Sequence, residues 1–224
     1  RTKADIVYSP GLRVSVNPIE GINVQLEGTY QFGTVGQAGT AEGKTKLSAY
    51  GLQGKMNYAL PVMKDQSPVL SAGITYLSGG RDKDADNKDH YFVSLFRNQY
   101  SGRIFHALGA NSSNLFIGEL AFEMVPVKDV TAKLTWYNLA LVNKFDATPP
   151  GNTNTVTLPN GCATTYLVTG NKAIGNELDL DLTYAYTEDV KFGVTAGYFA
   201  PGKAFSSDNK DSATQLLSSV SVAF

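Results

Sequence analysis

The chain ends on the stretch Gln215-Leu-Leu-Ser-Ser-Val-Ser-Val-Ala-Phe224, in which apolar side chains alternate with small or polar ones. Successive side chains of a strand point to opposite faces, so Leu216, Val220, Val222 and Phe224 share one face. The opposite face carries mostly small or polar groups, at Gln215, Leu217, Ser219, Ser221 and Ala223. The stretch therefore predicts a β-strand with one apolar face that ends on an aromatic residue.

The composition narrows the class of protein. The 224 residues include 22 Gly, 12 Tyr and 11 Phe, with 17% charged residues, a formal net charge of -1 and a mean hydropathy of -0.15. No apolar run approaches the roughly 20 residues that a helical membrane span needs, so any span has to be made of strands. A net charge near zero gives no electrostatic footprint for nucleic acid. The single Cys162 excludes an internal disulfide and argues against a thiolate metal cluster.

Upstream of this strand, alternating segments are joined by connections of two lengths. Short turns are expected at residues 17–21, 61–67, 126–129 and 187–189, and long polar connections at residues 33–44, 78–113, 142–175 and 201–213. Short turns at one end of the strands and long loops at the other are typical of transmembrane β-barrels. The sequence thus predicts an all-β, antiparallel up-and-down barrel.

The strands have one apolar and one polar face. In residues 177–186, acidic or polar side chains alternate with Leu and Tyr, and residues 23–32 and 130–136 repeat the pattern. Aromatic residues on the apolar face form two rows near the strand ends, with aliphatic residues such as Leu26, Leu120 and Leu180 between them. Two such rows match the two lipid–water interfaces. A β-sandwich is the alternative fold, because a second sheet would also cover an apolar face.

About nine strands are expected, beginning near residues 12, 23, 51, 69, 116, 130, 178, 191 and 215. Bacterial single-chain barrels normally have an even number of strands. Either one strand lies unrecognised in residues 81–113, or residues 1–224 form a single barrel domain that is the C-terminal part of a longer chain. We favour the longer chain, because an open sheet edge is unstable in lipid. The start at Arg1 instead of Met fits it.

Two regions carry a family resemblance. In the first, Ser94-Leu-Phe-Arg-Asn-Gln-Tyr-Ser-Gly102 precedes Asn114-Leu-Phe-Ile-Gly118, a Pro-x-Lys-Asp-Val turn at residues 126–130 and Leu134-Thr-Trp-Tyr137. In the second, Ile174-Gly-Asn-Glu-Leu-Asp-Leu180 leads to Gly197-Tyr-Phe-Ala-Pro-Gly202. From about residue 90 onward the chain resembles the alginate-export family of outer-membrane porins. The resemblance implies a large barrel that forms a passive pore for a uronic-acid polymer or for smaller solutes.

The inward charged residues are the candidates for lining that pore. They are Arg13, Glu27, Lys55, Glu119, Glu123, Lys133, Glu177, Asp179, Asp181 and Lys191. Six acids and four bases give a mixed wall, whereas a pore for a polyanion would be expected to present bases. Lys133 or Lys191 are expected to partner the acidic ladder of residues 177, 179 and 181. Basic residues of the long connection, Arg81, Lys83, Lys88, Arg97 and Arg103, would form a constriction if that loop folded inward; otherwise they are a solvated charge run.

These features place the protein in the outer membrane of a Gram-negative bacterium. Its expected partners are outer-membrane lipid and lipopolysaccharide and the barrel-assembly machinery, which would read Phe224 as a signal. The alternative function is a structural barrel that sheathes or anchors a partner, such as an electron-transfer conduit, in a surface complex. An enzyme is not expected, because His90 and His106 are the only histidines and both lie in the long connection. No cofactor or metal is expected, although the acidic residues 82–89 have calcium-compatible oxygens.

Overall fold

The computed structural model describes residues 5–36, 44–80, 88–95, 102–107, 113–144, 155–158, 164–167 and 169–223, and over these the chain is almost entirely β-structure. The strands are β1 (Ile6–Tyr8), β2 (Gly11–Ile19), β3 (Ile22–Gly36), β4 (Lys44–Ala59), β5 (Val69–Leu77), β6 (Lys88–Asp89), β7 (Leu115–Val127), β8 (Val130–Leu141), β9 (Thr155–Leu158), β10 (Thr164–Leu167), β11 (Ala173–Ala185), β12 (Val190–Pro201) and β13 (Ala213–Val222). One α-helix, α1 (Arg103–Ala107), and two 3-10 turns (Lys64–Gln66 and Ser207–Asn209) complete the elements. In the part of the chain that the structure describes, no helix has the length and apolarity to cross a membrane.

One large sheet contains eleven of the strands, in the order β1-β3-β4-β5-β7-β8-β11-β12-β13. β1 and β2 pair with successive parts of the same edge of β3, so they form one interrupted strand. The two-residue β6 adds a short parallel pairing to β4. The remaining neighbours are antiparallel and follow the chain order, which matches the nine up-and-down strands predicted from the sequence.

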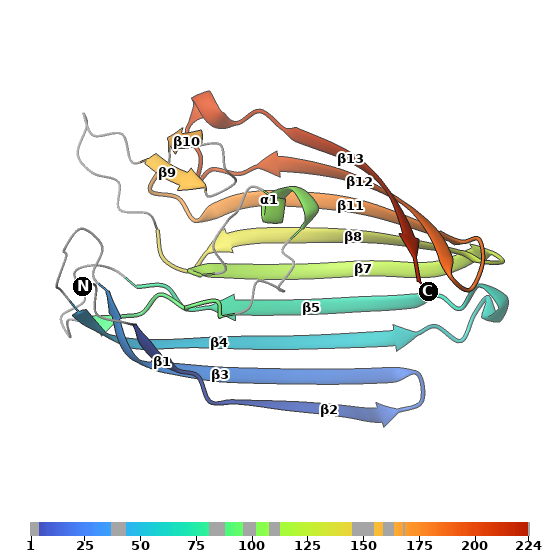
Figure 1. The fold of residues 1–224 in the computed structure, drawn as a ribbon, viewed down its shortest axis with the longest axis horizontal. Helices are drawn as coiled ribbons and strands as arrows, with labels where there is room; N and C mark the ends of the chain where they lie inside the picture. The colour runs from blue at the N-terminus through green and yellow to red at the C-terminus, as the bar shows by residue number, and fades with distance from the viewer. Residues whose placement is uncertain are drawn as a thin grey trace.

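The short turns lie at one end of the sheet and the long connections at the other (Figure 1). The β2–β3 and β7–β8 hairpins close through two residues each, and Gly21 (φ 80°) and Asp129 (φ 63°) take the positive φ that such tight hairpins require. The β4–β5 turn contains the 3-10 turn Lys64–Gln66, and residues 186–189 join β11 to β12. All four turns fall where the sequence predicted them.

Two connections contain more structure than expected. β4 begins at Lys44, seven residues before the predicted start at residue 51. β9 and β10 form a separate two-stranded hairpin inside the long connection between β8 and β11. The sequence signal for these parts was weak because they are short and rich in Lys, Thr and Ser.

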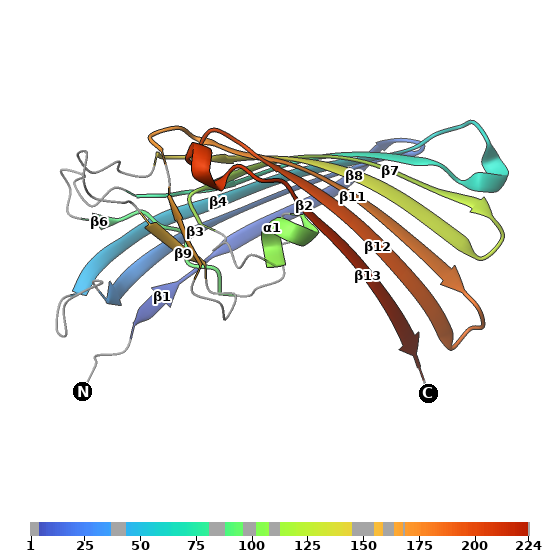
Figure 2. The same ribbon diagram turned by 90° about the horizontal axis from the view of Figure 1, so that it is seen from above.

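The sheet is strongly curved but open (Figure 2). No ladder among the described residues joins β13 to β1 or β2, so the all-β antiparallel sheet predicted from the sequence is confirmed, while its closure into a larger barrel stays a prediction. With nine alternating strands, β2 and β13 run in the same direction (Figure 1), and they cannot close the sheet through an antiparallel pair.

The helix α1 lies in the hollow of the sheet, which defines the concave face (Figure 2). Its residues contact the acidic side of β11, so the odd-numbered residues of β11 face the hollow and the even-numbered Leu residues face outward. A buried apolar cluster lies around α1 near the loop end of the strands: Ile104, Phe105, Leu115, Ile117, Leu139, Leu141, Ile174, Phe199 and Ala204. A second, smaller cluster contains Val35, Leu47 and Ala49, with Val7 and Val93 packed against it.

Candidate functional site

All ten predicted pore-lining residues lie on the concave side of the sheet. Directly paired residues of neighbouring strands share a face, and the register links Arg13 to Glu27, Glu27 to Gln53, and Glu123 to Lys133. Lys133 is in turn opposite Asp181. The remaining members follow from the two-residue period of the strands. The register therefore puts these ten residues on one face, and that they line a pore stays a prediction.

A cavity of about 420 Å³ lies on this face between the middle strands and α1. Its lining residues are Gln53, Lys55, Gly73, Thr75, Gly102, Arg103, Ile117, Glu119, Lys133, Thr135, Tyr137, Asp179 and Asp181. Three bases and three acids are among them, so the wall of the cavity is nearly balanced in charge. Five of the predicted residues (Lys55, Glu119, Lys133, Asp179 and Asp181) come together here.

Lys55 and Glu119 form an ion pair over Gly73, which has no side chain. Their strands, β4 and β7, are separated by β5, and Gly73 is the residue of β5 that lies between them. Because Gly73 has no side chain, the Lys55 ammonium and the Glu119 carboxylate approach to 3.9 Å. The Lys55 side chain is 42% exposed, so this pair contributes little to stability. It does fix two opposite charges at one edge of the cavity.

The acidic ladder of β11 holds the start of α1. The two carboxylate oxygens of Glu177 accept hydrogen bonds from the backbone N–H groups of Ile104 (2.5 Å) and Phe105 (2.9 Å). Asp179 accepts one from the backbone N–H of Arg103 at 2.9 Å. Glu177 is 1% exposed and Asp179 2% exposed. Both carboxylates are therefore buried against the backbone of α1, and Asp179 also lines the cavity.

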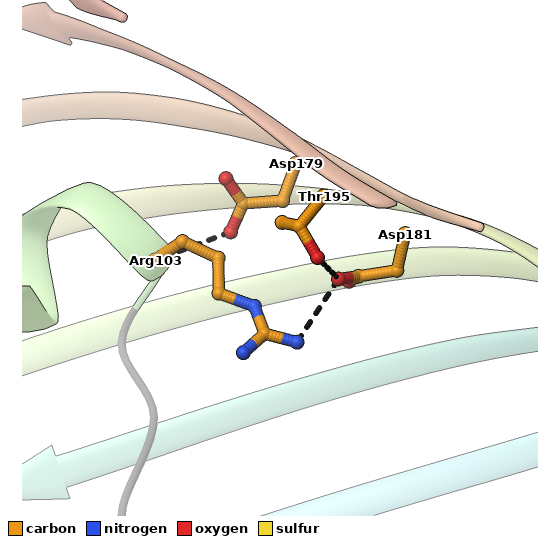
Figure 3. A network of polar contacts seen from close by, with 4 residues as sticks. All are labelled: Arg103, Asp179, Asp181 and Thr195. Carbon is orange, nitrogen blue, oxygen red and sulfur yellow. Dashed lines mark hydrogen bonds and ion pairs between the residues drawn. The ribbon is translucent and has the colours of Figure 1, made fainter. Parts of the chain in front are cut away.

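The third carboxylate binds the side chain of the same helix (Figure 3). Asp181 Oδ1 is 2.9 Å from Arg103 Nη2 and also accepts a hydrogen bond of 2.6 Å from the Thr195 hydroxyl on β12. The ion partner of the ladder is thus Arg103, and the expected partners, Lys133 and Lys191, do not pair with it. Lys191 lies opposite Ala185 near the turn, four residues along β12 from Thr195. Its place in the register keeps it away from Asp181.

A second part of the long connection, residues 88–95, is anchored on the other half of the sheet. Gln31, which is 1% exposed, donates from Nε2 to the Val93 carbonyl (2.9 Å) and accepts from the Val93 N–H (2.8 Å). His90 Nδ1 is 2.7 Å from the Ser48 carbonyl, and the Ser78 hydroxyl donates to the His90 carbonyl. These contacts reach three parts of the sheet: Gln31 lies on β3, Ser48 on β4, and Ser78 directly follows β5. His90 is therefore part of a structural contact.

The apolar anchor of α1 was missed by the sequence analysis. Ile104 and Phe105 are buried against concave-face residues of β7, β8 and β12, and the rings of Phe105 and Phe199 are 6.1 Å apart. Within β8, the inward positions change from Lys133 and Thr135 to Leu139 and Leu141 toward the loop end. That change from polar to apolar side chains on the inner face indicated that another part of the chain packs against the loop end of β8.

Several predicted features lie outside the described residues. These are Phe224, the basic residues Arg81, Lys83 and Arg97, and most of the acidic run 82–89. Two basic residues of the long connection, Lys88 and Arg103, are described, and Arg103 lines the cavity. Within the described ranges, no group of three or more His, Cys, Asp or Glu residues is arranged to hold a metal ion.

Comparison with known protein families matches residues 2–218 to the family model described as "Alginate export". The match contains α1, all three ladder carboxylates and every residue of the cavity. It confirms the resemblance read from residues 90–142 and 174–202, and it extends that resemblance to the first third of the chain. No match was found among curated proteins.

Proposed function

Because the chain belongs to the alginate export family, we propose that its sheet is part of the wall of a β-barrel channel in the outer membrane of a Gram-negative bacterium. The single observation that carries the proposal is the contrast between the two faces of the sheet. The outer face is apolar and uncovered, while the inner face carries charged rows, a polar cavity and an inward-folded helix. Membrane-spanning barrels with polar interiors have this arrangement.

The apolar outer face fits contact with lipid. Five aliphatic side chains on this face are between 38% and 62% exposed: Leu26, Leu120, Leu134, Leu180 and Val220. Contiguous apolar surface of this extent is rare on proteins that face water on all sides. The long strands of the main sheet contain 9 to 16 residues, enough for the roughly 9–11 residues that a tilted strand needs to cross the hydrocarbon core.

Aromatic side chains on the outer face support the same orientation. Near the loop end, Tyr50 and Tyr76 stack with ring centroids 5.5 Å apart, and Tyr8 stacks on Phe32 at 5.2 Å. Near the turn end, the Tyr186 ring contacts Phe192 edge-on at 6.1 Å. Rings of this kind are favoured at the two lipid–water interfaces. The turn end then faces the periplasm and the loop end faces the outside of the cell.

Closure of the sheet is part of the proposal. The open edges at β2 and β13 expose backbone N–H and C=O groups that have to find partners in a bilayer. We propose that further strands of a longer chain pair with these edges and complete a barrel of even strand number. The intact mass of the natural polypeptide tests this directly: a mass near 24.0 kDa, that of residues 1–224, would contradict it.

The cargo we propose is small hydrophilic solutes that cross by passive diffusion. The alginate export family is a transport family and not an enzyme family. In this chain, however, the cavity wall has three bases and three acids, and a channel built for a polyanion would present an excess of bases. The balanced wall favours weak charge selectivity.

Single-channel recording of the natural full-length protein in a planar bilayer tests the function. Open, ohmic steps are the expected result. A protein that inserts into the bilayer but carries no current in the absence of a partner would contradict the channel. That result would favour the structural barrel that sheathes a protein partner.

A further inference from the structure

We infer that the three carboxylates of β11 set the width of the channel by holding α1 against the inner wall, and that they do not act as its charge filter. The inference rests on the proposed channel function. It assigns a role to Glu177, Asp179 and Asp181 that differs from the selectivity role expected for acidic residues inside a pore.

The first observation is that the Glu177 carboxylate binds the backbone of α1. Both of its oxygens accept backbone N–H groups of α1, and its side chain is almost completely buried. A permeating ion has no access to a carboxylate in this position. Hydrogen bonds from backbone N–H groups to a carboxylate are among the stronger ones in proteins, so Glu177 holds the segment tightly.

The second step is the compensation of charge at Asp181. The Arg103 guanidinium lies 2.9 Å from Asp181, and Thr195 donates to the same oxygen. The charge of Asp181 is thereby neutralised by a residue of the segment it holds (Figure 3). Because Arg103 and Asp181 are 40% and 26% exposed, the pair remains in contact with solvent and gives only weak stabilisation by itself. Its effect is to direct the Arg103 side chain along the wall.

The third observation is that α1 and the inner face of the sheet approach closely at two glycines. Gly102 has a φ of 96°, and a Cβ placed on it would lie 2.5 Å from the carboxyl carbon of Glu177. Likewise, a Cβ on Gly197 of β12 would lie 3.3 Å from Cγ1 of Ile104. Gly102 thus allows the backbone at the start of α1 to approach the Glu177 carboxylate, and Gly197 leaves room on β12 for the side chains of Ile104 and Asp179. The buried side chains of Ile104 and Phe105 complete an attachment that is apolar on one side and charged on the other.

The consequence concerns the width of the lumen. The α1 segment, residues 102–107, occupies the hollow of the sheet next to the 420 Å³ cavity. Releasing the segment from β11 removes the hydrogen bonds that keep it at the wall and changes the open cross-section. Loss of the ladder therefore acts on conductance through the position of α1.

The experiment compares a ladder variant with a single-charge control variant in the natural full-length protein. The ladder variant is Glu177→Gln with Asp179→Asn and Asp181→Asn. Each amide keeps one neutral acceptor oxygen and replaces the other with an NH2 donor, so residue 177 can no longer accept from both Ile104 and Phe105. The charge control is Glu123→Gln, which removes an inner-face carboxylate of β7, two strands away from β11. Single-channel step size and amide hydrogen exchange of residues 103–105 are measured on each.

We expect the ladder variant to change the step size and to exchange the three amides about ten- to hundredfold faster, as loss of hydrogen bonds to charged acceptors implies. Exchange in Glu123→Gln should stay at the wild-type rate. An unchanged step size together with a shifted cation-to-anion permeability ratio in the ladder variant would overturn the inference and restore the charge filter. Unchanged exchange would overturn it as well.

Two further measurements separate a failure of the proposed channel function from a failure of the proposed attachment of α1. If the wild type inserts without conducting, the channel function fails, while the exchange measurement still tests whether the ladder holds α1. If the triple variant does not fold, Arg103→Met removes the side-chain contact from the segment and leaves all three wall carboxylates in place. A wild-type step size and wild-type exchange in Arg103→Met would then contradict the role assigned to the Arg103–Asp181 pair.

Discussion

Glu177 occupies the space that a side chain at residue 102 would need: a Cβ on Gly102 would lie 2.5 Å from the Glu177 carboxyl carbon and from its Oε2. The close approach lets the carboxylate reach the N–H groups of both Ile104 and Phe105. It also requires the positive φ of 96° at Gly102, a backbone conformation that residues other than Gly rarely adopt. The sequence position of this glycine is therefore set by the carboxylate opposite it.

Gly102→Ala should detach the start of α1 from β11. The substitution adds backbone strain of about 1–3 kcal/mol and a clash with Glu177. We expect faster amide exchange at residues 103–105 with little change in the strands. Gly118→Ala is the control, because a Cβ there meets its nearest neighbour, Asn138, at an ordinary 3.8 Å. Equal effects of the two variants on the α1 amides would contradict the contact.

Leu180→Arg should destabilise the protein in a bilayer, because Leu180 is exposed on the outer face between two inward acids of β11. A charge on the lipid face near the bilayer midplane costs about 2–4 kcal/mol. Thr183→Arg places the same side chain on the inner face of the same strand and should cost much less. The measurement is the free energy of unfolding in lipid vesicles. Similar losses for both variants would show that the face assignment is wrong.

The strands and their facing could be predicted because each rests on a local rule. The two-residue alternation in residues 177–186 fixes which side chains share a face, and tight turns such as Glu20-Gly21 fix the hairpins. The register then follows, since a slip of one residue would turn every apolar side chain of a strand inward. Nine strands and four turns were accessible in this way.

The attachment of α1 could not be predicted in the same way, because it joins residues 72 to 78 positions apart in the sequence. Nothing local to Arg103 indicates that Asp181 is its partner. Lys133 was the nearer choice by register, since it lies directly opposite Asp181, yet the long connection supplies the cation. Only the apolar inner residues Leu139 and Leu141 indicated that this part of the wall is covered.

Gln31→Leu should loosen residues 88–95 from the wall. The buried Gln31 amide donates to the Val93 carbonyl, accepts from the Val93 N–H and also contacts the Ser9 hydroxyl at 3.4 Å. The leucine therefore leaves the part-buried N–H and C=O of Val93 without these partners. Each such group costs about 1–3 kcal/mol. Gln25→Leu on the same strand and face is the control, because Gln25 bonds to the exposed Arg13 side chain and should change stability by about 0.5 kcal/mol or less. Denaturant titration distinguishes the two.

Removal of Phe224 should reduce the amount of protein in the outer membrane. The alternation of the last strand predicts that Phe224 shares the apolar face with Val220 and Val222. Phe224→Tyr keeps an aromatic ring and should restore assembly, whereas Phe224→Ala should behave like the deletion. Quantifying the protein in isolated outer membranes checks the order of the variants. Normal levels of the deletion variant would argue against an assembly signal at this residue.

Lys133→Gln should make the channel prefer cations more strongly. Lys133 lines the cavity, and neither of the ion pairs found among the described residues involves it, so its charge is available to a permeating anion. Lys191→Gln removes the same charge from the inner face near the turn end, outside the cavity. Because a charge acts most strongly where the walls are close and the local field is concentrated, the reversal potential in a salt gradient should shift more for Lys133 than for Lys191. Equal shifts would mean that the cavity is not the narrowest part of the ion path.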